Sequence, residues 1–148
     1  MMWSDLEMRE MIKELLLNIR WKNPAYVVVD LPPGTGHISQ TLVRFLSWPG
    51  GALLVTLAHR ASVLDVKKAI TMLHELHFPI IGVVENMTQF RCPNCDINSK
   101  LFGFLTPNPF EFPLVDHIPF DPQWDYTPLA HAVTAWMEAN LGSRPPQG

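Results

Sequence analysis

The segment from Asp30 to Gly36, with the sequence DLPPGTG, combines residue types that can bind a metal ion and a phosphate. The Asp30 carboxylate can hold a magnesium-bound water. Gly34 and Gly36 let the backbone approach a ligand closely and offer N–H groups to an anion. For a lone Asp-Pro-Gly turn, an acidic strand end would be the simpler interpretation. Seven residues of this chemistry after a predicted strand instead favour a loop that senses a terminal phosphate.

Cys92 and Cys95 form a second candidate site. Two thiolates at this spacing in a loop can both bind one soft metal ion. The pair is half of a four-thiolate set, and the sequence contains no other cysteine. Two chains about a twofold axis would supply four thiolates from identical loops. A zinc site completed by a histidine such as His117, and a redox-active dithiol, are the alternatives.

Composition limits the class of protein. A chain of 148 residues predicts one domain with a real core. The net charge of −3 and the lack of a Lys/Arg cluster argue against nucleic acid as a partner. No apolar run is long enough to span a membrane, and the acidic N-terminus does not look like a signal peptide. Together with the few cysteines, these features predict a cytoplasmic protein in a reducing environment.

The order of the predicted elements indicates how the candidate residues are positioned. The apolar, β-branched run 25–29 predicts a buried strand that ends at Asp30. Strands alternate with helices after it, which predicts an α/β fold with a mostly parallel sheet flanked by helices. The predicted strands are 25–29, 52–57, 80–85 and 114–119. The predicted helices begin at residue 4 or 5 and end near 23, cover 38–46, begin at a cap on Ser62 and end near 78, and cover 128–141.

Three further structural expectations follow from the pattern. The first helix should bury an apolar stripe, which consists of Leu6, Met8, Ile12, Leu15, Leu16 and Ile19. Residues 89–112 lose the periodic pattern and should leave the sheet as a loop around the cysteines. The domain should cover residues 1–142, with its cysteine loop at about 87–112, and residues 143–148 should be a disordered tail.

These motifs resemble the Mrp (ApbC-like) P-loop ATPases, a family of iron–sulfur cluster carriers related to MinD and ParA. DLPPGTG is similar to the family's Walker B and switch segment, although the family usually has an acidic residue where His37 stands. The segment VENM, residues 84–87, matches the corresponding family segment closely. The segments 58–69 and 118–121 resemble two later family motifs more loosely, since the first lacks the family's Pro-Gln pair and glycine.

The resemblance implies a partial P-loop NTPase (SIMIBI/MinD-like) fold and a set of site residues. Asp30 would be the catalytic carboxylate, and Asn86 would hydrogen-bond the adenine, as an amide with both donor and acceptor can. Cys92 and Cys95 would bind an iron–sulfur cluster, of the 4Fe–4S type, that bridges a homodimer. The remaining nucleotide-binding positions implied by the resemblance are Gly34, Thr35, Gly36, Asp65 and Asp121.

The phosphate-binding loop G-x-x-x-x-G-K-[ST] is missing from these 148 residues, because none of the five lysines follows a glycine. The resemblance thus covers the C-terminal half of the family's domain, which suggests a fragment, a split-gene product or an isoform. ATP and Mg²⁺ binding and ATP hydrolysis are expected of a full-length form, and hydrolysis by this chain alone is not.

Three functions are consistent with these features. The first is an iron–sulfur cluster carrier or assembly factor that delivers clusters to apo recipient proteins. The second is a non-catalytic metal-binding module that dimerises with itself or with a full-length relative through the cysteine loop. The third is a MinD/ParA-type nucleotide-dependent ATPase, which has no need of paired thiols. The first is favoured for the family and the second for this chain.

Overall fold

A computed structural model describes residues 5–22, 24–32, 34–45, 49–103, 105 and 107–141. The chain divides into two compact units, Met1–Trp48 and Pro49–Gly148. The predicted tail at 143–148 lies outside the described residues. None of the helices in the described ranges combines the length and apolar character needed to cross a membrane.

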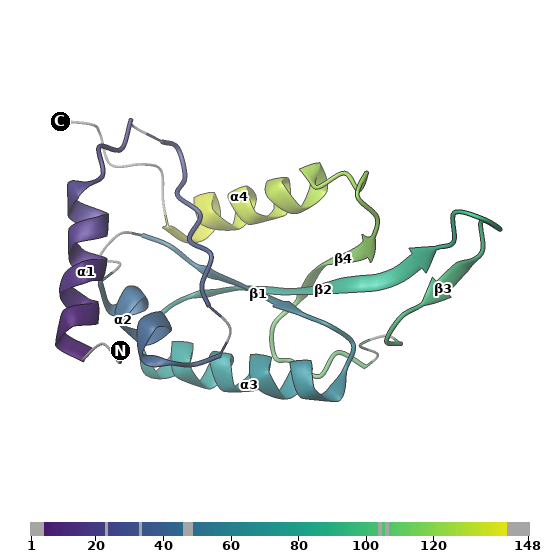
Figure 1. Ribbon diagram of the computed structural model, residues 1–148, viewed down its shortest axis with the longest axis horizontal. Helices are drawn as coiled ribbons and strands as arrows, with labels where there is room; N and C mark the ends of the chain where they lie inside the picture. Colours follow the sequence, from purple (N-terminus) through teal and green to yellow (C-terminus); the bar gives the residue numbers. More distant parts are fainter. Residues whose placement is uncertain are drawn as a thin grey trace. The chain divides into compact units, whose positions relative to one another are not determined.

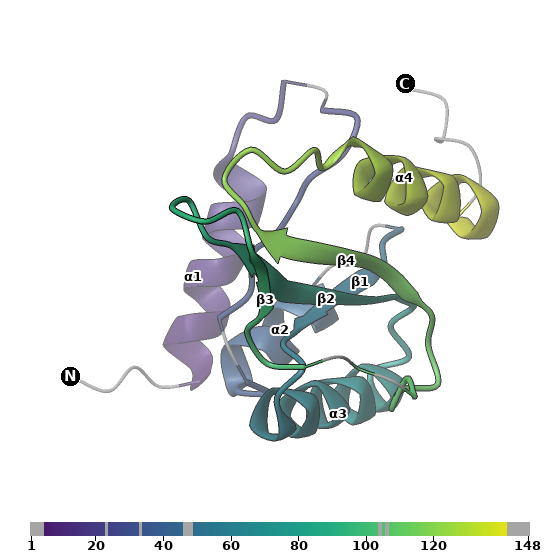
Figure 2. The same cartoon turned by 90° about the vertical axis from the view of Figure 1, so that its right-hand side faces the viewer.

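The second unit is a sheet with a helix on each face (Figure 1). Its central strand, β2 (Ile80–Arg91), pairs in parallel with β1 (Ala52–Thr56) and β4 (Leu114–Phe120) and antiparallel with the short β3 (Asn98–Lys100). Helices α3 (Arg60–Glu75) and α4 (Thr127–Leu141) cover opposite faces of this sheet, as Figure 2 also shows. The predicted α/β class with a mostly parallel sheet is therefore confirmed.

Two glycines allow this unit to pack closely. A Cβ at Gly82 would collide with the Val115 side chain and lie 2.9 Å from the Pro113 carbonyl oxygen. That carbonyl accepts a hydrogen bond from the Val83 amide at 2.9 Å, which joins β2 to the start of β4. A Cβ at Gly51 would lie 2.7 Å from the Trp136 ring, so the missing side chain makes room for α4. Because glycine has no Cβ, the neighbouring segments can approach the backbone closely at both positions.

The core of this unit includes residues from the predicted excursion at 89–112. Leu105 and Phe110 are buried with Val66 of α3 and Val83 of β2. The prediction that this stretch leaves the sheet was thus only partly right. Its beginning continues β2 and forms β3, while its apolar end returns to the core because burying these side chains removes them from water.

The first unit contains α1 (Asp5–Asn18) and α2 (His37–Phe45). The predicted strand at 25–29 is wrong: these residues form no strand, and Val28 is 93% exposed. A strand requires backbone pairing with a neighbour, and no ladder in the described part of the chain includes this run. Asp30 consequently follows an extended but unpaired segment.

The apolar stripe of α1 is also mostly exposed, in contrast to the prediction. Ile12 is buried, whereas Leu6, Leu15 and Ile19 are exposed. The side chains of Met8 and Leu16 lie outside the described set. Helical periodicity identifies the face that could be buried, but burial needs a second element to cover it.

Ser62 does not cap α3, as the sequence had suggested. The N-cap is His59, whose Nδ1 accepts a hydrogen bond from the Ala61 amide at 3.3 Å. The Ser62 hydroxyl instead accepts from the Leu57 amide at 3.0 Å and lies 2.9 Å from the Thr56 hydroxyl. Its oxygen therefore ties the end of β1 to the first turn of α3, which a capping role would not do.

Candidate functional site

The candidate site of the second unit is arranged along β2. The first half of this strand, Ile80–Glu85, is buried between β1 and β4. Its second half extends past the end of β1 and pairs with β3, and Figure 1 shows the resulting hairpin projecting from the sheet. Asn86 lies between the two halves, and Cys92 follows the last residue of the strand. One strand therefore carries both a predicted base-binding residue and a predicted metal ligand.

A pocket of about 380 Å³ opens where β2 and β4 leave the sheet. Asn86 and Asp121, which the sequence assigned to nucleotide binding from separate motifs, both line it. Adjacent parallel strands end at the same edge of a sheet, so residues at their carboxyl ends meet there. The described residues that line it are Asn86, Met87, Pro119, Phe120, Asp121, Pro122 and Tyr126.

Two aromatic residues of this pocket, Phe120 and Tyr126, were not predicted as site residues. Each is 53% exposed, so both rings present apolar surface beside the polar groups of the pocket. An exposed ring beside amide and carboxylate groups offers a surface on which a planar base can stack. Their position on either side of the predicted Asp121 loop was the sequence signal that could have identified them.

The polar groups of the pocket are held by short hydrogen bonds. Asn86 Oδ1 accepts from the Met87 amide at 2.9 Å. Asp121 Oδ1 accepts from the Gln123 amide at 2.9 Å, which fixes the carboxylate in the turn after β4. Both side chains thus have defined positions, and each presents further hydrogen-bonding capacity to a ligand.

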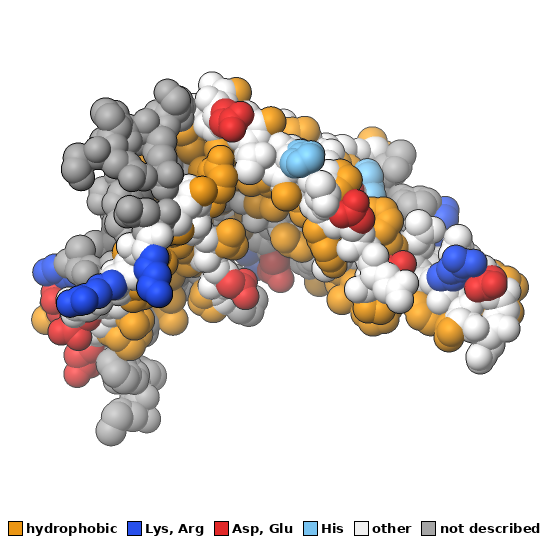
Figure 3. Space-filling model, turned by 90° about the horizontal axis from the view of Figure 1, so that it is seen from above, with side chains coloured by type: hydrophobic (Ala, Val, Ile, Leu, Met, Phe, Trp, Pro, Cys, Tyr) orange, Lys and Arg blue, Asp and Glu red, His pale blue; other side chains and the backbone are white. Residues whose placement is uncertain are grey.

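Cys92 and Cys95 lie in the turn between β2 and β3. The Cys92 amide donates to the Ile97 carbonyl at 3.0 Å, and the Asp96 amide donates to the Cys92 carbonyl at 2.9 Å. Arg91 Nε lies 3.2 Å from Asp96 Oδ1, and Figure 3 shows charged side chains of both signs together at the end of the molecule where this hairpin lies. These contacts close the turn around the two thiols.

The turn also favours the thiolate form of Cys92. The backbone amides of Asn94 and Cys95 and the Cys95 thiol donate hydrogen bonds to its sulfur, and together they lower the Cys92 pKa below the ordinary value for a thiol. Cys92 is half-buried and Cys95 is exposed. The thiolate is the form that binds metal ions, so the local backbone prepares this residue as a ligand.

We expect the lowered pKa to be visible in alkylation by iodoacetamide. In a Cys95→Ser variant the reaction reports Cys92 alone. Because amide hydrogen bonds lower the Cys92 pKa, the alkylation rate should reach half its maximum at a lower pH than the rate for a cysteine in an unstructured peptide. Mass spectrometry over a pH series measures both midpoints. Equal midpoints would show that the amides do not act on the sulfur.

A zinc site completed by His117 is not what the structure shows. His117 Nδ1 lies 2.9 Å from Glu85 Oε2, across the register pair that joins β4 to β2. Glu85 is fully buried, and its Oε1 accepts a hydrogen bond from the Leu105 amide at 3.3 Å. Among the described residues, no group of three or more His, Cys, Asp or Glu side chains could hold a metal ion. His117 thus contacts Glu85, and the structure does not bring it together with the two cysteines as the alternative of a zinc site would require.

The DLPPGTG segment lies in the first unit. Gly34 has a φ of +90°, a conformation that favours glycine, and its carbonyl lies 3.5 Å from the Ser39 hydroxyl. Gln40 Nε2 donates to the Thr35 carbonyl at 3.1 Å, and the Gln40 amide donates to the Gly36 carbonyl at 3.2 Å. The glycine-rich turn therefore leads directly into α2. Asp30 and Gly36 are exposed.

Asp65 stands apart from the other predicted residues of the second unit. It lies on α3, is exposed, and forms an ion pair with Lys68 at 3.2 Å. It is not one of the residues that line the pocket beside Asn86. An exposed ion pair one helical turn apart contributes little to stability, so this contact does not explain why an aspartate stands at position 65.

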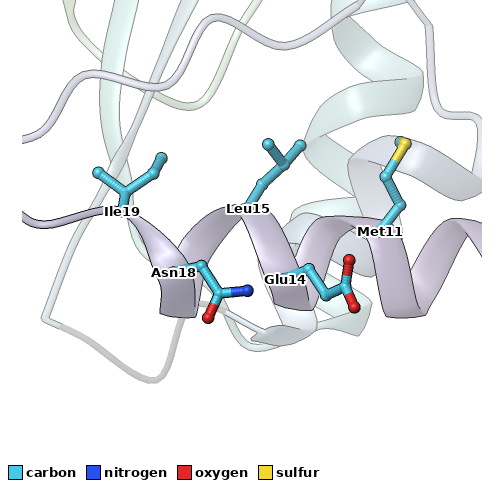
Figure 4. Close-up of a pocket in the computed structure, with 5 residues that line it drawn as sticks. All are labelled: Met11, Glu14, Leu15, Asn18 and Ile19. Atoms are coloured by element: carbon cyan, nitrogen blue, oxygen red, sulfur yellow. The ribbon is translucent and has the colours of Figure 1, made fainter.

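A second pocket, of about 320 Å³, is lined among the described residues by side chains of α1 and by Ile19 directly after it (Figure 4). Met11, Leu15 and Ile19 line it at intervals of four residues, and Glu14 and Asn18 contribute its polar atoms. These residues lie along one face of α1 and just past its end. One carboxylate and one amide on such a face are not an arrangement that performs catalysis.

Comparison with known families gives a match over most of the chain. The model of the NUBPL iron-transfer P-loop NTPases, a ParA group, matches residues 1–128. The chain is 34% identical over 126 residues to the cytosolic Fe-S cluster assembly factor CFD1 of Kluyveromyces lactis, covering 81% of this chain and 44% of that protein. It is 39% identical over 101 residues to an iron-sulfur cluster carrier protein of Methanocaldococcus jannaschii, covering 68% and 35%. The chain therefore spans less than half the length of these relatives.

A solved structure gives a similar result. A nucleotide-binding protein from Archaeoglobus fulgidus, in complex with ADP, superposes with a TM-score of 0.65 at 31% sequence identity. The match covers 90% of this chain and 54% of that one. The predicted likeness to P-loop nucleotide-binding proteins is therefore confirmed at the level of the fold.

Proposed function

This chain belongs to the NUBPL iron-transfer P-loop NTPase family, and we propose that it is an iron–sulfur cluster carrier that binds its cluster through Cys92 and Cys95. The observation that carries the proposal is the turn between β2 and β3. It presents two thiols at the end of a projecting hairpin and lowers the Cys92 pKa with backbone amides. Relatives of this chain are named cluster carriers and assembly factors, which supports the same function.

The pair of thiols in one chain leaves a cluster half coordinated. The described residues offer no third ligand near the pair. A second chain would supply the other two thiolates, so we propose a 4Fe–4S cluster that bridges a homodimer, or a heterodimer with a full-length relative. An exposed cluster of this kind could pass to apo recipient proteins. The names of two relatives as cytosolic factors support a cytoplasmic location for this activity.

Anaerobic reconstitution with iron and sulfide tests this proposal. The protein should turn brown, contain about four irons per two chains, and sediment as a dimer. A chelator that removes the iron should shift it toward monomer, because the cluster is the shared ligand. A monomer that carries the full cluster would contradict the bridging arrangement. A chain that binds zinc but no iron under these conditions would favour the non-catalytic metal-binding module.

We further propose that the pocket at Asn86 and Asp121 is the base site of a nucleotide. Its amide, its carboxylate and its two exposed aromatic rings support this assignment. Asp30, Gly34, Thr35 and Gly36 would serve the metal and phosphates of ATP in a full-length form. A MinD/ParA-type ATPase would use the same groups, but it would leave the cysteine turn unexplained.

For these 148 residues we expect weak ATP binding and no measurable turnover. The sequence lacks the Gly-Lys-Ser/Thr loop that cradles phosphates. Each charge-assisted hydrogen bond of that cradle is worth about 1.5–3 kcal/mol, so affinity should fall by orders of magnitude. Calorimetry and a phosphate-release assay measure both quantities. Micromolar ATP affinity would mean that other groups in this chain hold the phosphates.

A further inference from the structure

Strand β2 has a strained break between the pocket and the cysteine turn. Met87 has a φ of +52°, in the left-handed region that a residue with a side chain adopts only at a cost. The register between β2 and β4 shifts in the same place, between Asn86 and Phe90. Residues before the break pair with β1 and β4. After it Thr88 is still buried, and residues 89–91 pair with β3 in the projecting hairpin, with Phe90 also opposite Phe120 of β4.

A side chain of the pocket supports this strained conformation. Asn86 Oδ1 accepts the hydrogen bond from the Met87 amide at 2.9 Å. A side-chain amide that bonds the neighbouring backbone offers the chain an alternative to the regular ladder. Asn86 therefore holds the break in place as long as its carboxamide faces its own strand.

The same carboxamide is the group that a base would engage. Asn86 and Met87 both line the pocket. A carboxamide recognises an adenine edge with two parallel hydrogen bonds, one donated and one accepted. A base edge that pairs with the carboxamide competes with the Met87 amide for Oδ1 and for the orientation of the amide plane. We expect binding in the pocket to weaken the contact that stabilises the strained residue.

The hairpin is connected to the pocket at two points. Met87 lies five residues before Cys92, a span of about 16 Å in an extended strand. Phe90 of the hairpin packs against Phe120 of the pocket wall, with ring centroids 6.2 Å apart. A change of backbone conformation at Met87, or a shift of the Phe120 ring, therefore moves the turn that carries the two thiols.

We propose that Met87 is a positioning residue that couples the pocket to the cysteine turn. The inference rests on the proposed function, since it assumes a base in the pocket and a metal or cluster at Cys92 and Cys95. Base binding weakens the hydrogen bond of the Met87 amide and reorients the hairpin. Coupling between two sites is reciprocal, so a metal ion at the cysteines changes the affinity of the pocket for nucleotide by the same factor.

Nuclear magnetic resonance of the reduced, ¹⁵N-labelled chain, titrated with ADP, tests this coupling and tolerates weak binding. Amides of the pocket, such as Asn86 and Asp121, and amides of the turn, such as Cys95 and Ile97, should shift with one dissociation constant. Met87→Gly also removes a side chain from the pocket wall, so its ADP dissociation constant is not compared with that of the original chain. At ADP concentrations that saturate the pocket amides of this variant, the turn amides should no longer shift, because glycine adopts the break without strain. Met87→Leu, which keeps a side chain of similar size, should behave like the original chain.

Zinc provides a second measurement that does not depend on the glycine variant. Zn²⁺ bound at the cysteines should change the ADP dissociation constant by roughly 5–150-fold, and a Cys92→Ser/Cys95→Ser double variant should show no change. Chemical-shift changes in the pocket amides without changes in the turn amides would overturn the coupling and leave the proposed function intact. An ADP dissociation constant that does not change with zinc would do the same. No shifts at either place would overturn the coupling and the nucleotide part of the proposed function together.

Discussion

Cys92→Ser and Cys95→Ser are each expected to abolish cluster binding. A twofold site built from one cysteine pair per chain falls from four thiolates to two when either residue is replaced. A serine hydroxyl keeps the size of the side chain but does not supply the soft, easily ionised sulfur that iron–sulfur clusters require. Iron content after anaerobic reconstitution should therefore fall from about four per two chains to background in both variants.

Asn94→Ser is the matched control for these two variants. Asn94 lies between the cysteines and is exposed, and its contribution to the turn is a backbone amide that serine retains. Cluster content in this variant should equal that of the original chain. A full iron complement in either cysteine variant would remove the proposal that the pair holds the cluster. Iron loss in Asn94→Ser as well as in the cysteine variants would indicate a general failure of the turn.

The arrangement of the pocket could be predicted from the sequence because it depends on strand topology. Asn86 and Asp121 are 35 positions apart, yet each follows the buried part of a parallel strand. The family resemblance supplied the two motifs, and parallel strands with right-handed connections bring their carboxyl ends to one edge, which is where both residues lie. The cysteine spacing predicts a metal site from two residues alone, and this stays a prediction.

Features that depend on contacts between distant segments could not be predicted in this way. The apolar run at 25–29 has the composition of a strand, but no backbone partner pairs with it within the described residues. Ser62 has a side chain suited to a cap, but its hydroxyl accepts a hydrogen bond from the Leu57 amide after β1 instead. The left-handed Met87 carries no local signal, because methionine has no preference for that conformation.

Glu85 illustrates a buried polar contact that only the fold reveals. The residue belongs to the VENM motif, but its carboxylate serves two other segments of the chain. Oε2 contacts His117 Nδ1 on the adjacent strand, and Oε1 accepts from the amide of Leu105, which is itself buried in the core. One side chain thus joins β2, β4 and the segment that returns from the cysteine hairpin. A carboxylate can remain in a fully buried position because both of its oxygens have partners.

We expect Glu85→Ala to lower the free energy of unfolding by about 3–5 kcal/mol, because the Leu105 amide would lose its acceptor and the core would gain a cavity. Glu85→Gln keeps the volume and the acceptor for Leu105 and can still hydrogen-bond His117, so it should lose no more than about 1.5 kcal/mol. His117→Ala should cost an intermediate amount, about 1–3 kcal/mol, because it leaves Oε2 of the buried Glu85 without its partner although the imidazole ring itself is 55% exposed. Urea denaturation followed by circular dichroism measures all three variants. If Glu85→Ala were no less stable than Glu85→Gln, the carboxylate would not be the group that holds the Leu105 segment to the sheet.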